Sequence, residues 1–493
     1  MGVGVENGEV LMNLLANVLL DPGRASPEKS AITTVDGHHV TYADLERLSA
    51  RLAGLLVREY AIDKGDRVAV QSMKQWHLLA LSIACARIGA IYLPLNTAYT
   101  DRETLVLLDD ATPSLIVRES PIEHHTARVR LGELITRAQA HPSDFSDVAC
   151  DEMTPAAMLY TSGTTGRAKG AVLTHGNLVS NSLALNAAWG FTPDDVVLHA
   201  LPLFHTHGLF VGAFCALSSG ASLILMESFS AREVVRHLSS ATVFMGVPTY
   251  YVRLLEEPEF TREVARPLRL FTSGSAPMLR STHEEFISRT GHEIVERYGM
   301  TETGINTSNP IDGSLRMGTV GRALAGVDVR VRGASPGAIE VKGPNVFVDY
   351  WNRPELRESE FTPDGWFKTG DVGTLDEDGF LEIVGRAKDV IITGGLNVYP
   401  KELELVIDTF AGVLESAVIG LADADFGEAV TAVVVPHKDA RLDEVELGKL
   451  ARASFAAFKV PKRFIIVDEL PRNAMGKVEK ARLRSELSVP PGS

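Results

Sequence analysis

Strand-like and helix-like hydrophobic patterns alternate along most of this chain, and this alternation restricts the possible folds more than any other feature. Thr41 can cap a helix whose leucines run from Leu45 to Leu55 at helical spacing, and a short apolar run at 67–71 follows. A second helix is expected around 78–88, followed by a strand that ends at Leu95. Further buried strands are expected at 115–117, 196–200, 222–226, 242–247 and 268–271. This rhythm predicts layered, parallel α/β sheets.

The pattern changes near residue 330, where short apolar runs separated by Gly and Asp suggest a small antiparallel β-subdomain. After residue 389 a compact tail is expected, with helices at 401–410 and 443–458 and strands at 416–419, 429–435 and 464–467. A chain of 493 residues is too long for one hydrophobic core. We therefore predict a large N-terminal domain over 1–387, of layered α/β sheets plus the β-subdomain, and a small mobile α+β domain over 388–493.

Charge and cysteine content exclude several classes of partner. There are 48 basic and 63 acidic residues, a formal net charge of −15, which argues against binding to nucleic acid or to an anionic membrane. Three cysteines without metal-ligand spacing suit buried thiols in a reducing compartment. The first 20 residues lack the basic flank of a signal peptide, and no apolar run is long enough to span a bilayer. We expect a cytoplasmic protein.

The segment from Tyr160 to Gly170, YTSGTTGRAKG, is the strongest local signal. Its glycines allow the backbone to fold closely around a ligand, while hydroxyl groups and Lys169 supply donors and a cation. This composition suits the β- and γ-phosphates of ATP, although the spacing is not that of a Walker loop. An ordinary Gly/Ser/Thr-rich surface loop is the alternative. The candidate phosphate-binding residues are Thr161, Ser162, Gly163, Thr164, Thr165 and Lys169.

Other segments share a family signature with this loop. YTSGTTGRAKG resembles the signature of the adenylate-forming superfamily, which includes acyl-CoA synthetases, firefly luciferases and the adenylation domains of peptide synthetases. The resemblance continues in family order through LPLFHTHGL (201–209), FTSGSAP (271–277), ERYGMTETG (296–304), WFKTGD (366–371), GRAKDVIITGG (385–395) and PRNAMGKVEK (471–480). The chain departs from the family at Ala168, where proline is usual, and at Ile392 and Thr393, where many members carry a lysine. The second departure leaves open how coenzyme A is held.

The resemblance assigns roles in joining a carboxylate to the α-phosphate of ATP with release of pyrophosphate. Two anions meet in that step, so cations must lie at the transition state. By resemblance, Lys477 bridges the carboxylate and the α-phosphate, while Glu302 holds Mg²⁺ together with Thr165. Thr301 donates to the α-phosphate, and His205 is a further catalytic candidate. The resemblance implies that Tyr298 stacks on adenine and that Asp371 accepts hydrogen bonds from the ribose hydroxyls. The other residues that it assigns to the nucleotide are Ser275, Ala276, Pro277, Arg297, Gly299, Met300 and Arg386.

Each of these residues also has a simpler interpretation. Lys477 fits a solvated lysine, Glu302 a surface carboxylate, and Asp371 a turn cap before Gly373. Their place within ordered motifs favours the functional interpretation.

The family's second half-reaction transfers the acyl group to a thiol after the small domain rotates. The resemblance places the hinge at Lys388 and the passage for the coenzyme A thiol at Gly394, Gly395 and Leu396. Rotation would withdraw Lys477 from the phosphates. An ordinary loop turn is the alternative for the two glycines. Acetylation of Lys477 by a lysine acetyltransferase would remove its charge and stop adenylation.

The acyl pocket is expected at positions that flank the motifs: His207, Ser275, Arg297, Met300 and Ile305. Relatives that take fatty or aromatic acids usually have a small residue at the position of Arg297. An arginine in a buried pocket is costly unless an anion pairs with it, and its planar fork suits a carboxylate. The expected substrate is therefore a small acid with a second carboxylate, malonate first and methylmalonate next. The alternative is that Arg297 pairs with Glu296 or Glu302 and leaves an ordinary pocket.

The sequence thus predicts an ATP-, Mg²⁺- and coenzyme A-dependent acid–thiol ligase that makes malonyl-CoA through an acyl-adenylate. LPLFHTHGLF and ERYGMTETGINTSNP are similar to segments of malonyl-CoA synthetases in particular. Two enzymatic alternatives stay open: a short- or medium-chain monocarboxylate–CoA ligase, and a stand-alone adenylation domain that loads a carrier protein. A catalytically inactive binding protein is disfavoured because Lys477, Glu302 and Asp371 are all present.

Overall fold

The computed structural model describes residues 13–162, 168–393, 396–423, 426–438, 440–473 and 477–488. These residues form two compact units. The first contains the described residues up to 317 together with 321–328 and 341–367, and the second contains 318–320, 329–340 and the described residues from 368 onward. The second unit therefore begins ahead of Lys388, so the boundary and hinge expected there stay predictions.

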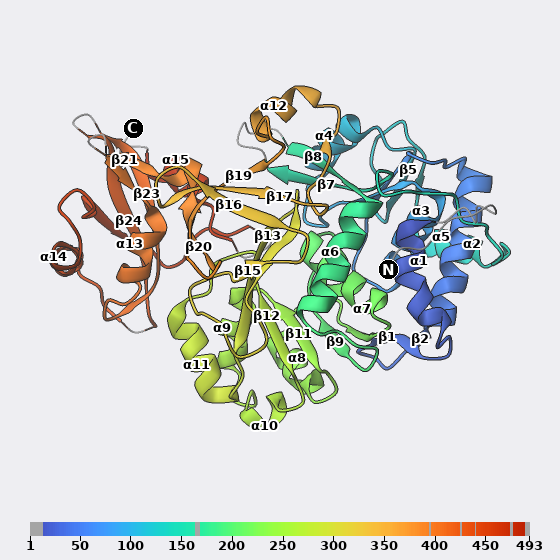
Figure 1. Cartoon of the computed structure of the whole chain (residues 1–493), viewed down its shortest axis with the longest axis horizontal. Helices are drawn as coiled ribbons and strands as arrows, with labels where there is room; N and C mark the ends of the chain where they lie inside the picture. Colours follow the sequence, from blue (N-terminus) through green and yellow to red (C-terminus); the bar gives the residue numbers. More distant parts are fainter. Residues whose placement is uncertain are drawn as a thin grey trace. The chain divides into compact units, whose positions relative to one another are not determined.

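Two sheets form the framework of the first unit (Figure 1). The nine-stranded sheet has the order β15-β14-β13-β12-β11-β9-β10-β1-β2 and is parallel from β13 to β1. Its strands are β1 (Ser30–Thr34), β2 (His39–Thr41), β9 (Val196–His199), β10 (Ser222–Leu225), β11 (Val243–Gly246), β12 (Leu270–Ser273), β13 (Ile294–Met300), β14 (Gly304–Ser308) and β15 (Arg322–Ala323).

The seven-stranded sheet has the order β18-β8-β7-β4-β3-β5-β6, with β8 antiparallel to both of its neighbours. Its strands are β3 (Arg67–Gln71), β4 (Ile91–Pro94), β5 (Leu115–Arg118), β6 (Arg128–Val129), β7 (Pro155–Ser162), β8 (Ala168–Thr174) and β18 (Asp349–Tyr350). Five of these strands, β3, β4, β5, β6 and β7, run parallel, as the alternating pattern predicts.

Helices cover these sheets and fill the space between them. The helix after Thr41 begins with a capping box, in which Thr41 and Asp44 each accept from the other's backbone N–H. Helix α6 contacts both β8 and β14, and so lies between the two sheets (Figure 1). The helices of this unit are α1 (Leu14–Arg24), α2 (Tyr42–Tyr60), α3 (His77–Ile88), α4 (Asp101–Ala111), α5 (Leu131–Ala138), α6 (His175–Ala188), the π-helix η1 (His207–Ala213), α7 (Phe214–Ser218), α8 (Ala231–Leu238), α9 (Pro248–Glu256), α10 (Arg262–Ala265), α11 (Arg280–Thr290), η2 (Pro354–Leu356) and α12 (Arg357–Glu360).

The second unit is built on two smaller sheets. A four-stranded sheet has the order β16-β17-β19-β20, and a five-stranded one has the order β22-β21-β24-β23 with β25 alongside β24. The strands are β16 (Asp328–Arg332), β17 (Gly337–Lys342), β19 (Phe367–Leu375), β20 (Leu381–Arg386), β21 (Ile391–Thr393), β22 (Leu396–Val398), β23 (Val413–Asp423), β24 (Gly427–Pro436) and β25 (Arg463–Ile466). The helices are η3 (Ala387–Asp389), α13 (Pro400–Ile407), α14 (Glu444–Ser454) and α15 (Lys480–Leu487).

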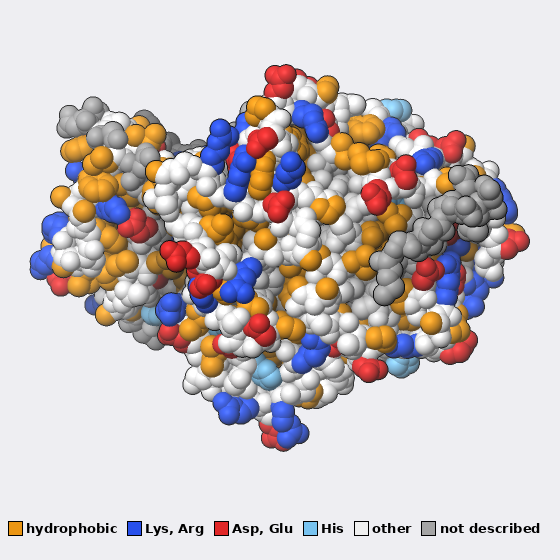
Figure 2. Space-filling view, in the orientation of Figure 1, with side chains coloured by type: hydrophobic (Ala, Val, Ile, Leu, Met, Phe, Trp, Pro, Cys, Tyr) orange, Lys and Arg blue, Asp and Glu red, His pale blue; other side chains and the backbone are white. Residues whose placement is uncertain are grey.

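On the face shown in Figure 2, basic and acidic side chains of the described residues are interspersed. Nucleic-acid binding normally needs basic residues gathered on one face. Among the described residues, no helix combines the length and apolar character that crossing a membrane requires.

A carboxyl group in the second unit makes its stability depend on pH. The Asp408 carboxylate accepts from Ser416 Oγ at 2.7 Å, and burial raises its pKa to about 7. Because the folded state binds this proton more tightly than the unfolded chain does, the stabilisation is complete below pH 3.8 and is lost as the pH rises to about 7. Asp408→Asn should remove that loss of stability. Between pH 4 and 7 the thermal midpoint of the variant should therefore fall less than that of the wild type, and the two changes should differ by roughly a few degrees.

Scanning calorimetry at several pH values measures this difference. Asp443→Asn is a matched control, because Asp443 is an exposed N-cap residue of α14 that asparagine can replace. Equal pH dependence in Asp408→Asn and in the wild type would contradict the assignment.

Candidate active site

The predicted phosphate loop connects the two antiparallel strands β7 and β8. Thr161 pairs with Lys169 across this hairpin, so the ends of the loop lie side by side. Lys169 is buried, and its Nζ lies 2.7 Å from Glu360 Oε1 and 4.9 Å from the ring centre of Tyr350. Gly163, Thr164 and Thr165 lie outside the described residues, as does the side chain of Ser162. The hairpin therefore presents one hydroxyl and one ammonium group at the base of the loop.

The expected magnesium ligand lies next to this hairpin. Glu302 is buried in the turn between β13 and β14, where its Oε1 accepts from Thr161 Oγ1 at 3.1 Å and from Tyr350 Oη at 2.9 Å. Thr301 precedes it and is partly exposed. The structure thus brings Thr161, Lys169 and Glu302 together from motifs far apart in the sequence, and adds Tyr350 and Glu360 to them.

The expected acyl-pocket residues gather at the carboxyl ends of parallel strands in the nine-stranded sheet, where open α/β folds bind ligands. Arg297 on β13 is buried, and its guanidinium lies against Gly274, where a Cβ atom would come within 2.5 Å of Nη1. His207 begins η1 and is also buried, with its Nδ1 3.5 Å from Ser275 Oγ. Met300 is the last residue of β13 and is partly exposed, whereas Ile305 lies on the neighbouring strand β14 and is buried.

Arg297 is a buried cation that has no carboxylate partner among the residues that the structure describes. Its Nε and Nη2 have no hydrogen-bond partner among the residues that the structure describes. Glu296 lies 3.9 Å from His283 and Glu302 accepts from Thr161 and Tyr350, so within the described part of the chain neither glutamate pairs with Arg297. Burial lowers the pKa of Arg297 to about 10, which keeps it charged at neutral pH.

One histidine, His207, lies near this arginine, and a second, His205, lies near His207. Burial and the charge of Arg297 lower the pKa of His207 well below its usual value, and burial lowers that of His205 to about 4. The Nε2 atoms of both histidines lack partners among the described residues. A neutral imidazole beside a guanidinium that has no counter-ion among the described residues makes a region that an anion can enter with favourable pairing.

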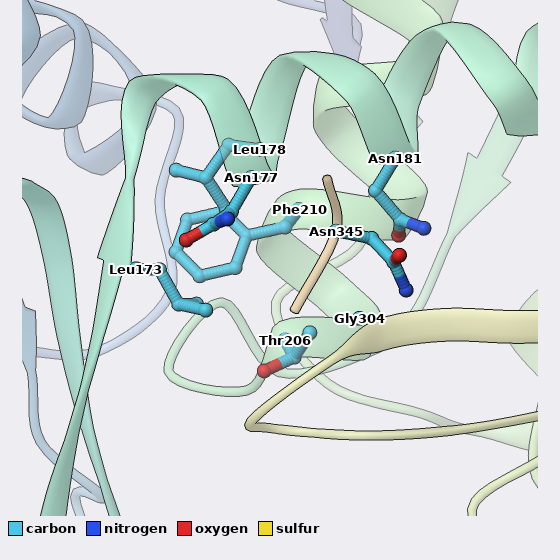
Figure 3. A pocket seen from close by; sticks show the side chains of 8 residues that line it. All are labelled: Leu173, Asn177, Leu178, Asn181, Thr206, Phe210, Gly304 and Asn345. Carbon is cyan, nitrogen blue, oxygen red and sulfur yellow. The ribbon is translucent and has the colours of Figure 1, made fainter. Parts of the chain in front are cut away.

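A small cavity with polar and apolar lining lies beside η1, close to the same motif. Its volume is about 10 Å³, roughly that of one water molecule, so the acid substrate is too large for it. Figure 3 shows the amides of Asn181 and Asn345 on one side of it and Phe210 on the other, with Thr206 below. The Thr206 hydroxyl has no partner within the described residues. The cavity belongs to the packing of η1 against α6.

The second unit holds the other predicted nucleotide residues. Asp371 on β19 is buried and pairs with Arg386 on β20, Nε to Oδ1, at 2.6 Å. Both residues lie close enough to act electrostatically on the ammonium of Lys477, whose backbone N–H donates to Asn473 Oδ1 at 3.0 Å. The structure therefore brings Asp371, Arg386 and Lys477 together inside one unit.

The remaining predicted residues are less informative. Lys388 lies in η3, and Leu396 begins β22 with its side chain exposed. Gly394 and Gly395 lie outside the described residues. Tyr298 is buried on β13, next to Gly299, whereas Ser275 and Pro277 are exposed and Ala276 is partly exposed in the loop after β12. Ser275 has a positive φ of 69°, which is uncommon for a residue other than glycine and occurs often at functional sites.

Comparisons with known families decide the assignment of the chain. Residues 21–351 match the AMP-binding enzyme family, and residues 402–477 match the AMP-binding enzyme C-terminal domain. The chain is an AMP-binding enzyme.

Relatives of this AMP-binding enzyme include ligases for different acids. The malonate–CoA ligase of Arabidopsis thaliana is 34% identical over 92% of this chain and 85% of its own length. A feruloyl-CoA synthase from Amycolatopsis sp is 35% identical over 94% of this chain and 96% of its own. The solved structure of ATP-bound MatB from Rhodopseudomonas palustris is 46% identical, covers 96% of this chain and 99% of its own, and superposes with a TM-score of 0.92. The family and the predicted α/β architecture with a small C-terminal domain are thereby confirmed.

Four residues that the sequence did not single out lie near the candidate site or beside residues that follow its strands. Tyr350 and Glu360 follow no motif, and only the fold brings them to Lys169. Lys74 and His199 had a readable signal, because each is a polar residue at or just after the carboxyl end of a predicted buried strand. Lys74 Nζ lies 2.9 Å from His199 Nδ1.

Proposed function

We propose that this AMP-binding enzyme joins malonate to the thiol of coenzyme A at the expense of ATP. In the first step a carboxylate oxygen bonds to the α-phosphorus, and the bond from that phosphorus to pyrophosphate breaks. In the second step the coenzyme A sulfur attacks the acyl carbon, loses its proton and displaces AMP. Methylmalonate is the second expected substrate.

The observation that carries the choice of acid is the buried guanidinium of Arg297, whose Nε and Nη2 have no partner among the described residues. Among the described residues no carboxylate neutralises it, and the neighbouring histidines are neutral. A dicarboxylate would supply the missing counter-ion with its second carboxylate while the first reacts. The malonate–CoA ligase of Arabidopsis thaliana among the relatives supports the same acid.

The nucleotide is proposed to bind the residues that the family resemblance assigns to it. Lys169 and Thr161 would hold the β- and γ-phosphates, Asp371 the ribose, and Tyr298 the adenine. Lys477 would bridge the carboxylate and the α-phosphate after the small domain closes, and rotation about Lys388 would then withdraw it. The ATP-bound form of MatB supports a nucleotide site of this kind.

Glu302 fits a magnesium ligand. Mg²⁺ is usually held by one or two carboxylates together with substrate phosphates. Glu302 is such a carboxylate, and the part of the chain that the structure describes contains no cluster of three or more potential ligands for a protein-only site. When bound, the ion would neutralise charge on the phosphate oxygens as they separate.

A monocarboxylate–CoA ligase is the second candidate, because the feruloyl-CoA synthase of Amycolatopsis sp is equally similar. The cytoplasm stays the predicted location, consistent with three free, buried cysteines. A carrier protein and a lysine acetyltransferase stay predicted partners on the basis of the sequence.

A panel of acids tests the proposal. AMP formation with ATP, Mg²⁺ and coenzyme A would be compared for malonate, methylmalonate, acetate, butyrate, hexanoate, coumarate and ferulate. Turnover limited to the two dicarboxylates is the expected result. Turnover with monocarboxylates alone would keep the ligase assignment and overturn the choice of malonate.

A further inference from the structure

A lysine and a histidine that no motif contains form a hydrogen-bonded chain leading to the acyl pocket. Lys74 follows β3, and its Nζ lies 2.9 Å from His199 Nδ1 and 2.8 Å from the His199 carbonyl oxygen. His199 ends β9, and its Nε2 lies 2.7 Å from the carbonyl oxygen of Gly208 in η1. These hydrogen bonds therefore connect the segment after the seven-stranded sheet's β3 with the nine-stranded sheet and the π-helix.

Simple chemistry fixes the direction of each hydrogen bond. A carbonyl oxygen only accepts, so His199 Nε2 carries the hydrogen that it donates to Gly208. Burial lowers the pKa of His199 to about 3, so the ring is neutral and its Nδ1 must accept. Lys74 is then the donor to Nδ1, and it thereby holds His199 in the tautomer that can bind η1.

The packing around His199 is close enough to transmit its position. A Cβ atom at Gly212 would lie 2.8 Å from His199 Nε2, so the glycine lets the ring lie directly on the helix backbone. A Cβ atom at Gly208 would come within 2.0 Å of the Pro202 carbonyl oxygen, so the loop that precedes η1 also packs directly against the backbone of Gly208. A π-helix within an α-helix often marks a functional site.

The last of these hydrogen bonds is made to Gly208, which is one residue away from the predicted acyl-pocket residue His207. His207 immediately precedes Gly208, and its imidazole is close enough to Arg297 for the guanidinium to lower its pKa. We propose that Lys74 is a positioning residue for the acid substrate: through His199 it holds the Gly208 carbonyl and so fixes His207 beside Arg297. This inference rests on the proposed function, because it assigns the pocket at His207 and Arg297 to the acid.

Lys74→Met tests the inference, since methionine has a similar length and lacks the donors. The expected result is a rise of about tenfold in KM for malonate, with KM for ATP within about twofold of the wild type. Lys29→Met is the matched control, because Lys29 also donates to backbone carbonyls of two distant segments, at Pro193 and Gly220. That control should lower the thermal midpoint without separating the two KM values.

A double-mutant cycle tests whether the two residues act as a unit. The amide of His199→Gln can donate to Gly208 without help from a lysine, so Lys74→Met should have little further effect in that background. Lys74→Arg, which keeps a donor, should recover part of the malonate KM. Equal rises in KM for malonate and ATP, an unchanged KM for malonate, or additive effects in the cycle would each overturn the proposal.

The same measurements separate this inference from the proposed function. The wild type is first assayed with the acid panel, and the variants are assayed with the acid that it prefers. If that acid is a monocarboxylate, the choice of malonate fails, whereas a selective rise in KM for that acid in Lys74→Met still supports the positioning role.

Discussion

Lys477→Met should abolish formation of the acyl-adenylate and leave the thioester-forming step largely intact. The ammonium of Lys477 is proposed to neutralise charge where the carboxylate meets the α-phosphate, and removing such a group typically costs about 10²- to 10³-fold in rate. In the proposed cycle, the second step takes place after that lysine has been withdrawn. Acid-dependent pyrophosphate release measures the first step, and single-turnover thioester formation from a supplied adenylate measures the second.

A matched control tests whether the effect is specific to the charge of Lys477 or would follow from the loss of any lysine. Lys449→Met removes an exposed lysine of α14 that pairs with Glu446 in the same unit, and should leave both steps unchanged. If Lys477→Met slowed both steps equally, Lys477 would not be specific for adenylation, and its withdrawal by rotation about Lys388 would lose its support.

Arg297→Gly should abolish the use of malonate and admit longer monocarboxylic acids. Losing one partner of a buried charge pair costs about 2–5 kcal/mol, or roughly 30- to several-thousandfold in kcat/KM for malonate. The space vacated by the guanidinium would accommodate an aliphatic chain. The measurement is kcat/KM for malonate, butyrate and hexanoate in the wild type and the variant.

Arg232→Ala serves as the control, because Arg232 is an exposed arginine of α8 in the same unit. It should keep the acid profile of the wild type. Unchanged malonate kinetics in Arg297→Gly would show that the second carboxylate is bound elsewhere, whereas loss of every acid together with a lower thermal midpoint would indicate a structural role for Arg297.

The sequence patterns predicted the elements that have strong hydrophobic periodicity. The helix after Thr41 and the buried strands β3, β5, β9 and β10 lie where expected, because a parallel strand covered on both faces is a continuous apolar run. The short strands β18, β21 and β22 were missed, since two or three residues leave no periodic signal. Strand order was also unreadable, because it depends on how long crossovers pack rather than on local sequence.

For the candidate site, the structure brings together several of the residues that belong to motifs. Thr161 and Glu302, 141 positions apart, share a hydrogen bond, and Asp371 pairs with Arg386 as their neighbouring roles imply. Glu360 and Tyr350 were missed because they come close to Lys169 only in the folded structure. The absence of a counter-ion for Arg297 among the described residues could not be read from the sequence either, because Glu296 is its immediate neighbour in the chain.

The unpaired guanidinium has a consequence for the rejection of wrong substrates. A monocarboxylic acid of similar length would place a methyl group against Arg297, shutting out water without supplying charge. The complex would then carry the full desolvation cost of an isolated cation. Discrimination would therefore reside in the instability of the incorrect complex as much as in attraction for the correct one. A pocket of this kind excludes the abundant simple acids without needing a wall to block them.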